Sequence, residues 1–338
     1  MESFPLVSVI IIVLIALVFD FINGFHDAAN SIATVVSTRV LSPRNAVLMA
    51  AFFNFIAVFF VGVQVAKTVG TGIVNPLIVD NSLIFSALCG AITWNLITWW
   101  LGLPSSSSHA LIGGLIGAGL VKGGIKVLVW KGIIKTASFI ILSPLIGLTL
   151  GLFLMILTLN LSQYGTVASA SSMFRKFQLL SAATFSLSHG MNDAQKTMGI
   201  IAVVLFTNGY LGPSFYIPYW VEFVCYLVIG LGTMTGGWRI VKTMGTKITK
   251  LQPMGGFCAE TAAAISIIGA SVAGIPVSTT HTISGAIMGV GSTKRLSAVR
   301  WGVAGKIMWA WVLTIPISAL ISAVIYLLLT ILLQLGTN

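Results

Sequence analysis

Two short polar segments of this 338-residue chain carry carboxylates and hydroxyls, and each segment occurs twice. Residues 24–28 read Gly-Phe-His-Asp-Ala, and residues 190–194 read Gly-Met-Asn-Asp-Ala. Residues 104–109 read Pro-Ser-Ser-Ser-Ser-His, and residues 276–281 read Pro-Val-Ser-Thr-Thr-His. All four lie within apolar stretches, where an unpaired carboxylate or hydroxyl is energetically costly. Duplicated and interrupted polar segments inside a hydrophobic protein are typical of transporters whose binding site lies between two internal repeats.

The two aspartates of the first motif, Asp27 and Asp193, are the candidate ligands for a cation. Clusters of Asp, Asn and Gln oxygens, completed by main-chain carbonyls, suit a hard cation such as Na⁺. We therefore predict a sodium site formed by Asp27, Asn30, Asp193 and Gln195. Asp20 is a weaker candidate, because it can simply cap or pair locally. Three further side chains in apolar stretches are candidates for ion coupling: His26, Glu222 and Glu260. For both glutamates, structural pairing is an equal alternative.

The two hydroxyl runs are predicted to bind an anion, because each stands where a helix is expected to begin. The first amides of a helix have no partner within it, and the helix start carries about half a positive charge. Two such starts, rich in donors, suit a tetrahedral anion, although ordinary helix caps are the alternative. The predicted ligands are Ser105, Ser106, Ser107, Ser108, Ser278, Thr279 and Thr280. Four further side chains are candidates to contact the anion or to orient the hydroxyls: His109, His281, Asn192 and Lys196. A structural role is an equal alternative for the two histidines, and pairing with a carboxylate is the alternative for Lys196.

The composition predicts an all-α polytopic membrane protein with about 10–12 membrane segments. The chain is 57% apolar and 7% charged, whereas a soluble domain is roughly 25% charged. Many stretches reach the ~20 apolar residues that cross a bilayer core. The net charge of +11 is assigned to short basic loops at the membrane faces and not to nucleic-acid binding. The candidate spans are 5–38, 45–65, 83–121, 136–161, 177–206, 214–236, 256–292 and 305–335.

Several of these stretches are too long for one crossing, because an α-helix rises about 1.5 Å per residue. Glycine and proline at the motifs predict breaks at Asn23-Gly24, at Gly102 to Pro104, at Gly190 and at Gly274 to Pro276. Residues 83–121 and 256–292 are therefore expected to form helix–break–helix hairpins. The sequence does not decide whether these hairpins are re-entrant or cross the membrane.

The duplication extends beyond the motifs and predicts two repeats of inverted topology. Residues 104–119 and 276–291 share six identities in sixteen positions. The segment 239–250 has four basic residues, whereas its counterpart 66–82 has one lysine and one aspartate. Since basic loops face the cytoplasm, equivalent segments are expected on opposite sides and both termini outside. The basic segment 122–135 disagrees with this scheme. The predicted organisation is an N-terminal half (1–161), a short cytoplasmic connection (162–176) and a C-terminal half (177–338).

The motifs resemble the twin signatures of the inorganic phosphate transporter (PiT) family. Residues 26–30 (His-Asp-Ala-Ala-Asn) and 188–199 (Ser-His-Gly-Met-Asn-Asp-Ala-Gln-Lys-Thr-Met-Gly) carry the resemblance, together with the two Pro-(Ser/Thr)-His segments. Many members have Asn where this chain has His26, and the long hydrophilic central loop of some members is absent. The resemblance implies a secondary transporter, not an enzyme, that imports phosphate with Na⁺ or H⁺. It also implies a multi-pass homodimer in the cell membrane, with no cofactor beyond the coupling ion.

Three alternative functions remain on the sequence alone. Symport of sulfate or another oxyanion would use the same donors. An ion channel would also contain intramembrane polar residues. An intramembrane serine hydrolase would need one serine paired with one histidine, whereas this chain duplicates both groups, which favours binding.

Overall fold

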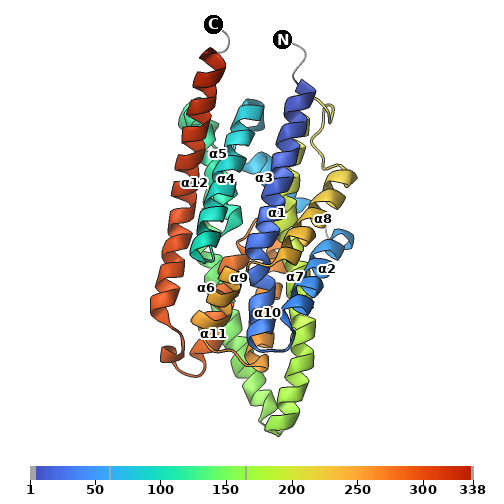
Figure 1. The fold of residues 1–338 in the computed structure, drawn as a ribbon, viewed down its shortest axis with the longest axis vertical. Coiled ribbons are helices and arrows are strands. Elements are labelled where there is room, and N and C mark those ends of the chain that lie inside the picture. The colour runs from blue at the N-terminus through green and yellow to red at the C-terminus, as the bar shows by residue number, and fades with distance from the viewer. Residues whose placement is uncertain (1–4, 61, 164–165, 336–338) are drawn as a thin grey trace.

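The computed structural model describes residues 5–60, 62–163 and 166–335, and this part of the chain is α-helical (Figure 1). Its only β pairing is an isolated bridge between Val74 and Leu128. The all-α class predicted from the composition is confirmed. The helices are α1 (Pro5–Ser37), α2 (Pro43–Ile56), α3 (Gln64–Gly72), α4 (Asn81–Leu101), α5 (Ser107–Gly123), α6 (Trp130–Ser162), α7 (Val167–Thr207), α8 (Tyr219–Thr235), α9 (Trp238–Lys242), α10 (Pro253–Val272), α11 (Thr279–Ser292) and α12 (Trp301–Leu335).

Six described helices are long and apolar enough to cross a membrane: α1, α4, α5, α6, α10 and α12. Two bent pairs bring the number to eight if each pair is one span. One pair is α2 with α3, and the other is α8 with the segment 238–247, which includes the π-helical turn Thr243–Lys247. The predicted connection 162–176 is helical from Val167 onward, because α7 begins there. The protein is therefore a multi-pass helical membrane protein.

The predicted breaks at Asn23-Gly24 and Gly190 are wrong, since α1 and α7 run through both motifs without interruption. These glycines serve close packing instead. A Cβ on Gly24 would lie 2.2 Å from the carbonyl oxygen of Ile229 in α8. A Cβ on Gly190 would lie 2.6 Å from the carbonyl oxygen of Asn54 in α2. Glycine at these positions lets two helix backbones approach each other closely, as small residues do in membrane proteins.

The other two predicted breaks are present. Gly102 follows α4 with φ +65°, and Gly274 follows α10 with φ +64°, a conformation that glycine adopts without strain. After each turn, a serine caps the next helix. The main-chain amide of His109 donates to Ser106 Oγ, and that of His281 donates to Ser278 Oγ, both at 3.2 Å. Residues 83–121 and 256–292 are thus helix–break–helix hairpins, as expected.

Figure 1 shows that each hairpin returns to the end of the molecule from which it started. Helix α5 runs toward the end where α1 starts and α12 ends, whereas α11 runs toward the opposite end. Helix α5 packs against α4 and α12, and α11 packs against α10 and α6. Helices α1 and α7 pack against each other beside both hairpins. The starts of α5 and α11 are consequently presented to α1 and α7 in the interior of the molecule.

The segment 122–135 lies at the end of the molecule where α1 begins. It pairs with the segment before α4 through the Val74–Leu128 bridge. An ion pair between Lys122 and Asp80 joins the same two segments. One of the four lysines in this basic segment is therefore neutralised locally, which weakens its value as a marker of the cytoplasmic side.

Candidate functional site: a buried polar centre between the two hairpins

The four duplicated motif segments meet in one buried centre. The starts of α5 and α11 touch through His109 and His281, whose ring centroids are 4.8 Å apart. Asp27 of α1 and Asp193 of α7 lie beside these starts, and both side chains are buried. A buried ionised group needs hydrogen-bond donors or a counter-charge close to it. The contacts of each charged group therefore indicate which ions the centre could accept.

Asp27 accepts hydrogen bonds from both hairpins. Ser107, the first residue of α5, donates to Asp27 Oδ2 at 2.8 Å, and Thr280 of α11 lies 3.5 Å from Oδ1. His26 Nδ1 donates to Oδ1 at 2.6 Å, and its Nε2 lies 3.1 Å from the Thr98 hydroxyl. His26 therefore orients the carboxylate that was predicted to hold a cation.

Asn30 and Lys196, which occupy equivalent places after the two aspartates, each contact the hairpin of the other half. The Asn30 amide donates to Thr280 Oγ1 at 2.8 Å and to Thr279 Oγ1 at 3.3 Å. The Lys196 ammonium donates to the Ser108 hydroxyl at the start of α5. These reciprocal contacts join the two halves of the chain at the centre.

Lys196 also neutralises a carboxylate. Its Nζ lies 2.7 Å from Asp193 Oδ1 and 2.9 Å from the carbonyl oxygen of Val277, just before α11. The sequence left open whether this lysine meets a carboxylate or an anion. In this structure it pairs with the carboxylate while it touches both hairpins, so it is also placed beside the hydroxyls.

Three acid or imidazole groups form a candidate cation cluster. Ligand atoms of Asp27, His189 and Asp193 all lie within 4.8 Å of one another, and all three residues are buried. His189 Nδ1 donates to the Asn54 side-chain oxygen at 3.1 Å. Its Nε2 then faces Asp193 Oδ2 at 3.6 Å, and neither atom has a hydrogen-bond partner among the described residues. When the imidazole carries its proton on Nδ1 alone, the lone pairs of Nε2 and Oδ2 oppose each other, and a cation between them would satisfy both.

Some of the predicted ligands have structural contacts instead. The Gln195 side-chain oxygen accepts the amides of Val65 and Ala66, at 2.9 and 3.2 Å, and so caps the start of α3. Asn192 donates to Ser271 Oγ at 2.9 Å and accepts from the Val277 amide at 3.3 Å, which holds the break between α10 and α11.

Ser105 and the two motif histidines, His109 and His281, contact other residues around the centre. Ser105 donates to Thr98 Oγ1 at 2.8 Å and lies 3.4 Å from His26 Nε2. His281 stacks on Trp311, whose indole nitrogen donates to the carbonyl oxygen of Pro104 at 2.9 Å. The two motif histidines are thus packed between the hairpins and α12.

The two glutamates predicted as coupling candidates lie apart from the centre. Glu260 of α10 is buried, and it accepts hydrogen bonds from Gln178 at 3.1 Å and Ser181 at 2.5 Å, near the start of α7. Glu222 lies in the first turn of α8 and is partly exposed. The structure brings neither glutamate together with Asp27 and Asp193.

Sequence reasoning missed Asn23, whose side-chain oxygen lies 2.6 Å from the Ser107 hydroxyl, and the place of His189 in the candidate cation cluster. The spacing of these residues from the aspartates could have revealed them, because side chains three or four residues apart lie on one helix face. Asn23 precedes Asp27 by one turn, and His189 precedes Asp193 by one turn, so each lies on the same helix face as its aspartate.

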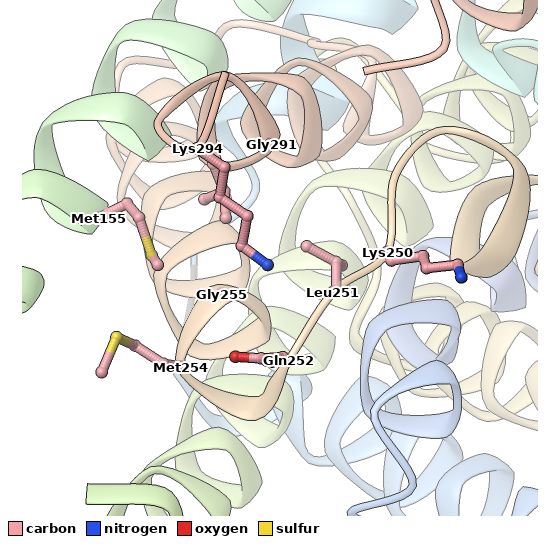
Figure 2. A pocket seen from close by; sticks show the side chains of 9 residues that line it. Met155, Lys250, Leu251, Gln252, Met254, Gly255, Gly291 and Lys294 are labelled. Carbon is pink, nitrogen blue, oxygen red and sulfur yellow. The ribbon is translucent and has the colours of Figure 1, made fainter. Parts of the chain in front are cut away.

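Two cavities between α6, α10 and their neighbours lie away from the centre. Figure 2 shows one of about 20 Å³, room for about one water molecule, between α6, the start of α10 and the end of α11. Lys294 extends into it, whereas Lys250 points away. A neighbouring groove of about 630 Å³ shares Met155 and Gln252 with it. Neither cavity is lined by a motif residue, and the side chains of the centre are at most 3% exposed, so the centre is closed.

A helical membrane protein with a closed polar centre between two helix–break–helix hairpins has the architecture of a membrane transporter. A model described as "Phosphate transporter family" matches residues 23–168 and 160–322 of the chain. The chain belongs to this family, which confirms the predicted resemblance. The protein is accordingly a phosphate transporter and not an enzyme.

Relatives in two bacteria and one solved structure agree with this assignment. The chain is 61% identical to the "Probable low-affinity inorganic phosphate transporter" of Rhizobium meliloti (strain 1021), over 96% of each chain. It is 47% identical to the protein of the same description from Bacillus subtilis (strain 168), over 96% of this chain and 98% of that protein. A solved structure described as "The sodium-dependent phosphate transporter" matches with a TM-score of 0.85 and 27% identity, covering 96% of this chain and 99% of that chain.

Replacement of Lys196 by Met is expected to destabilise the fold, because it leaves Asp193 buried without a counter-charge. Removing one partner of a buried pair costs about 3–5 kcal/mol, and Lys196→Met/Asp193→Asn should recover most of that loss. Unfolding in mixed micelles measures it. The control is Lys122→Met, since the more exposed Lys122–Asp80 pair contributes at most about 1 kcal/mol. A double variant no more stable than Lys196→Met would contradict this assignment.

Proposed function

We propose that this protein imports inorganic phosphate together with Na⁺ across the cell membrane. The observation that carries the proposal is the convergence of Asp27, Asp193 and His189, within 4.8 Å, beside two helix starts that present hydroxyls. A cation cluster and an anion site that share side chains have linked occupancies, which is the requirement for coupled transport. The similarity to a solved sodium-dependent phosphate transporter supports Na⁺ as the coupling ion.

Sodium is proposed to bind before phosphate. Two carboxylates and one ammonium leave the centre with a net negative charge, which repels an anion in low-dielectric surroundings. A cation held by Asp27, Asp193 and their neighbours removes this charge. Asp193 Oδ2 and His189 Nε2, which have no hydrogen-bond partner among the described residues, are the atoms most open to it. Asn30 contributes its side-chain oxygen, which is also unpartnered in the described part of the chain.

Phosphate is proposed to bind between the starts of α5 and α11. The donors there are the hydroxyls of Ser107, Ser108, Thr279 and Thr280, the first amides of both helices, and Lys196. In the closed structure these groups are bonded to each other and to Asp27 and Asn30, so binding exchanges internal hydrogen bonds for bonds to the anion. Ser106 and Ser278 are already engaged as caps and contribute mainly by holding the helix starts.

The two halves are proposed to be inverted repeats, with both termini outside and the protein as a homodimer. Each helix of the first half has a counterpart in the second half, and counterparts pack in the same way. Helix α5 packs against α12 as α11 packs against α6, and α1 packs against α8 as α7 packs against α2. The opposite directions of α5 and α11 support the inversion (Figure 1). Light scattering in detergent micelles tests the dimer, and a monomeric mass would contradict it.

The inversion makes a topological prediction. Single cysteines at the exposed positions Thr71 and Thr246 are introduced into a chain without Cys89, Cys225 and Cys258. A membrane-impermeant maleimide should label the first on intact cells and the second only after the cells are opened. Labelling of both positions from one side would show that the repeats are not inverted as proposed.

The coupling role of the aspartates is tested in liposomes. Asp27→Asn and Asp193→Asn should each reduce uptake of labelled phosphate driven by a Na⁺ gradient to background, because an amide cannot neutralise the cation. Thermal unfolding checks that the variants remain folded, and Asp80→Asn, remote from the centre, is the matched control. Near-normal Na⁺-driven uptake by both variants would refute the sodium site.

The anion site is tested by binding. Ser107→Ala/Ser108→Ala and Thr279→Val/Thr280→Val should each weaken phosphate affinity at least tenfold, because a hydrogen bond to a charged group contributes about 1.5–3 kcal/mol. Ser106→Ala/Ser278→Ala should instead lower chiefly the unfolding temperature. Isothermal calorimetry with phosphate and with sulfate gives both affinities. Loss in only one half would contradict the symmetric site, and equal sulfate affinity in the wild type would favour an oxyanion symporter of wider specificity.

A further inference from the structure

Asp20 is a buried acid outside the central site. Its side chain is fully buried in α1, and one carboxylate oxygen, Oδ1, accepts the Thr197 hydroxyl of α7 at 2.8 Å. The other oxygen, Oδ2, has no hydrogen-bond partner among the described residues. Asp20 precedes Asp27 by seven residues, which is about 10 Å along a helix. Thr197 follows Asp193 by four residues on α7, so both helices place Asp20 on the side of the centre where α1 begins.

No cation offsets a charge on Asp20 within the described chain. On α7, the negative charge of Asp193 repels a charge on Asp20, whereas the Lys196 ammonium is bound to Asp193 and Ser108. From α8 come two weak acids close enough to interact with it, Cys225 and Tyr226.

The other packed elements bring no cation either. Helix α8 also carries Glu222 and α4 carries Cys89, neither of which is cationic. Arg44 stands in the first turn of α2, beyond the far end of α1, and α9 with the following π-turn packs beside residues 25–37. Helices α10 and α11 reach α1 only from Asp27 onward among the described contacts, and His26 is bound to Asp27. Helix α5 carries His109, which contacts His281, and Lys122, which is paired with Asp80.

The surroundings of Asp20 suit a proton better than a metal cation. A hard cation takes about six oxygen ligands, whereas among the described residues only the Thr197 hydroxyl donates a hydrogen bond to this carboxyl, and its hydrogen already points at Oδ1. A proton needs one oxygen, and Oδ2 has no hydrogen-bond partner in the part of the chain that the structure describes. A neutral acid also avoids the cost of an unpaired charge in the membrane interior.

We propose that Asp20 is a proton-binding site that couples proton uptake to phosphate binding in the central site. The proposal rests on the function proposed above. Asp193 lies close enough for the two carboxyls to repel when both are charged. A proton on Asp20 therefore lowers the negative potential at the centre and favours the anion. Asp20 has no acidic counterpart, because the equivalent position in the second half is Ser186, which donates to the Ala182 carbonyl. This site therefore breaks the symmetry of the repeats.

Infrared spectroscopy tests the proton directly. The wild type in liposomes is expected to show the carbonyl stretch of a protonated carboxylic acid, and Asp20→Asn should lose intensity in that band. Asp80→Asn, an acid paired with Lys122, should leave the band unchanged. Thr197→Val keeps the carboxyl but removes its hydroxyl donor, so the band should move in frequency. A band that is absent in the wild type, or that survives intact in Asp20→Asn, overturns the proposal.

Uptake measurements test the coupling. With Na⁺ equal on both sides, an inward proton gradient should accelerate phosphate uptake by the wild type and by Asp80→Asn, but not by Asp20→Asn. Because Asn resembles the neutral acid, the ratio of Asp20→Asn uptake to wild-type uptake should rise with pH, and phosphate ionisation cancels in that ratio. An equal response of Asp20→Asn and wild type overturns the proposal. Failure of the sodium-coupled mechanism is recognised separately, because the wild type would then show no Na⁺-driven uptake. If Na⁺-driven uptake is present in the wild type and in Asp20→Asn, the sodium-coupled mechanism stands and only the proton site is in question.

Discussion

Charge compensation inside an apolar medium is the constraint on which the rest of the structure depends. Asp27 and Asp193 are buried in the interior, and a charge in such a place needs partners at hydrogen-bond distance. The chain supplies them by breaking two hairpins so that α5 and α11 begin in the interior. Hydroxyls from both helix starts and the ammonium of Lys196 are thereby brought to carboxylates that would otherwise destabilise the fold. In the proposed mechanism, the same groups serve an anion and a cation when the centre opens.

Contacts between the halves at the centre explain how one bound ion can influence another. Asn30 of α1 contacts the start of α11, and Lys196 of α7 contacts the start of α5. An ion that displaces either side chain must alter the hairpin of the opposite half. Close helix contacts at Gly24 and Gly190 pack α1 against α8 and α7 against α2, so the backbones beside the centre are tightly fitted. These shared contacts are the physical basis of the interdependent binding of phosphate and a cation that we propose.

Much of the site could be predicted because its determinants are local. The Pro-(Ser/Thr)-His segments predict capped helix starts, and Ser106 and Ser278 are the caps. The breaks at Gly24 and Gly190 were predicted wrongly, because glycine permits both a turn and a close helix contact, and only the neighbouring backbone distinguishes them. Gln195 was grouped with the sodium ligands since its side chain can coordinate, yet its oxygen caps α3, a helix 130 positions away in the chain.

The sequence by itself determined the all-α membrane class, the hairpin breaks and the residue types of the polar centre, since composition, proline and helix caps act over a few residues. Only the tertiary structure decided which partners those residues have. Lys196 meets Asp193 one helical turn away, but also Ser108 and the Val277 carbonyl from two other elements. Asp20 looked able to pair locally, yet it faces Thr197 with one oxygen unpartnered among the described residues. Pairing of buried charges depends on packing between helices distant in sequence, which no local pattern encodes.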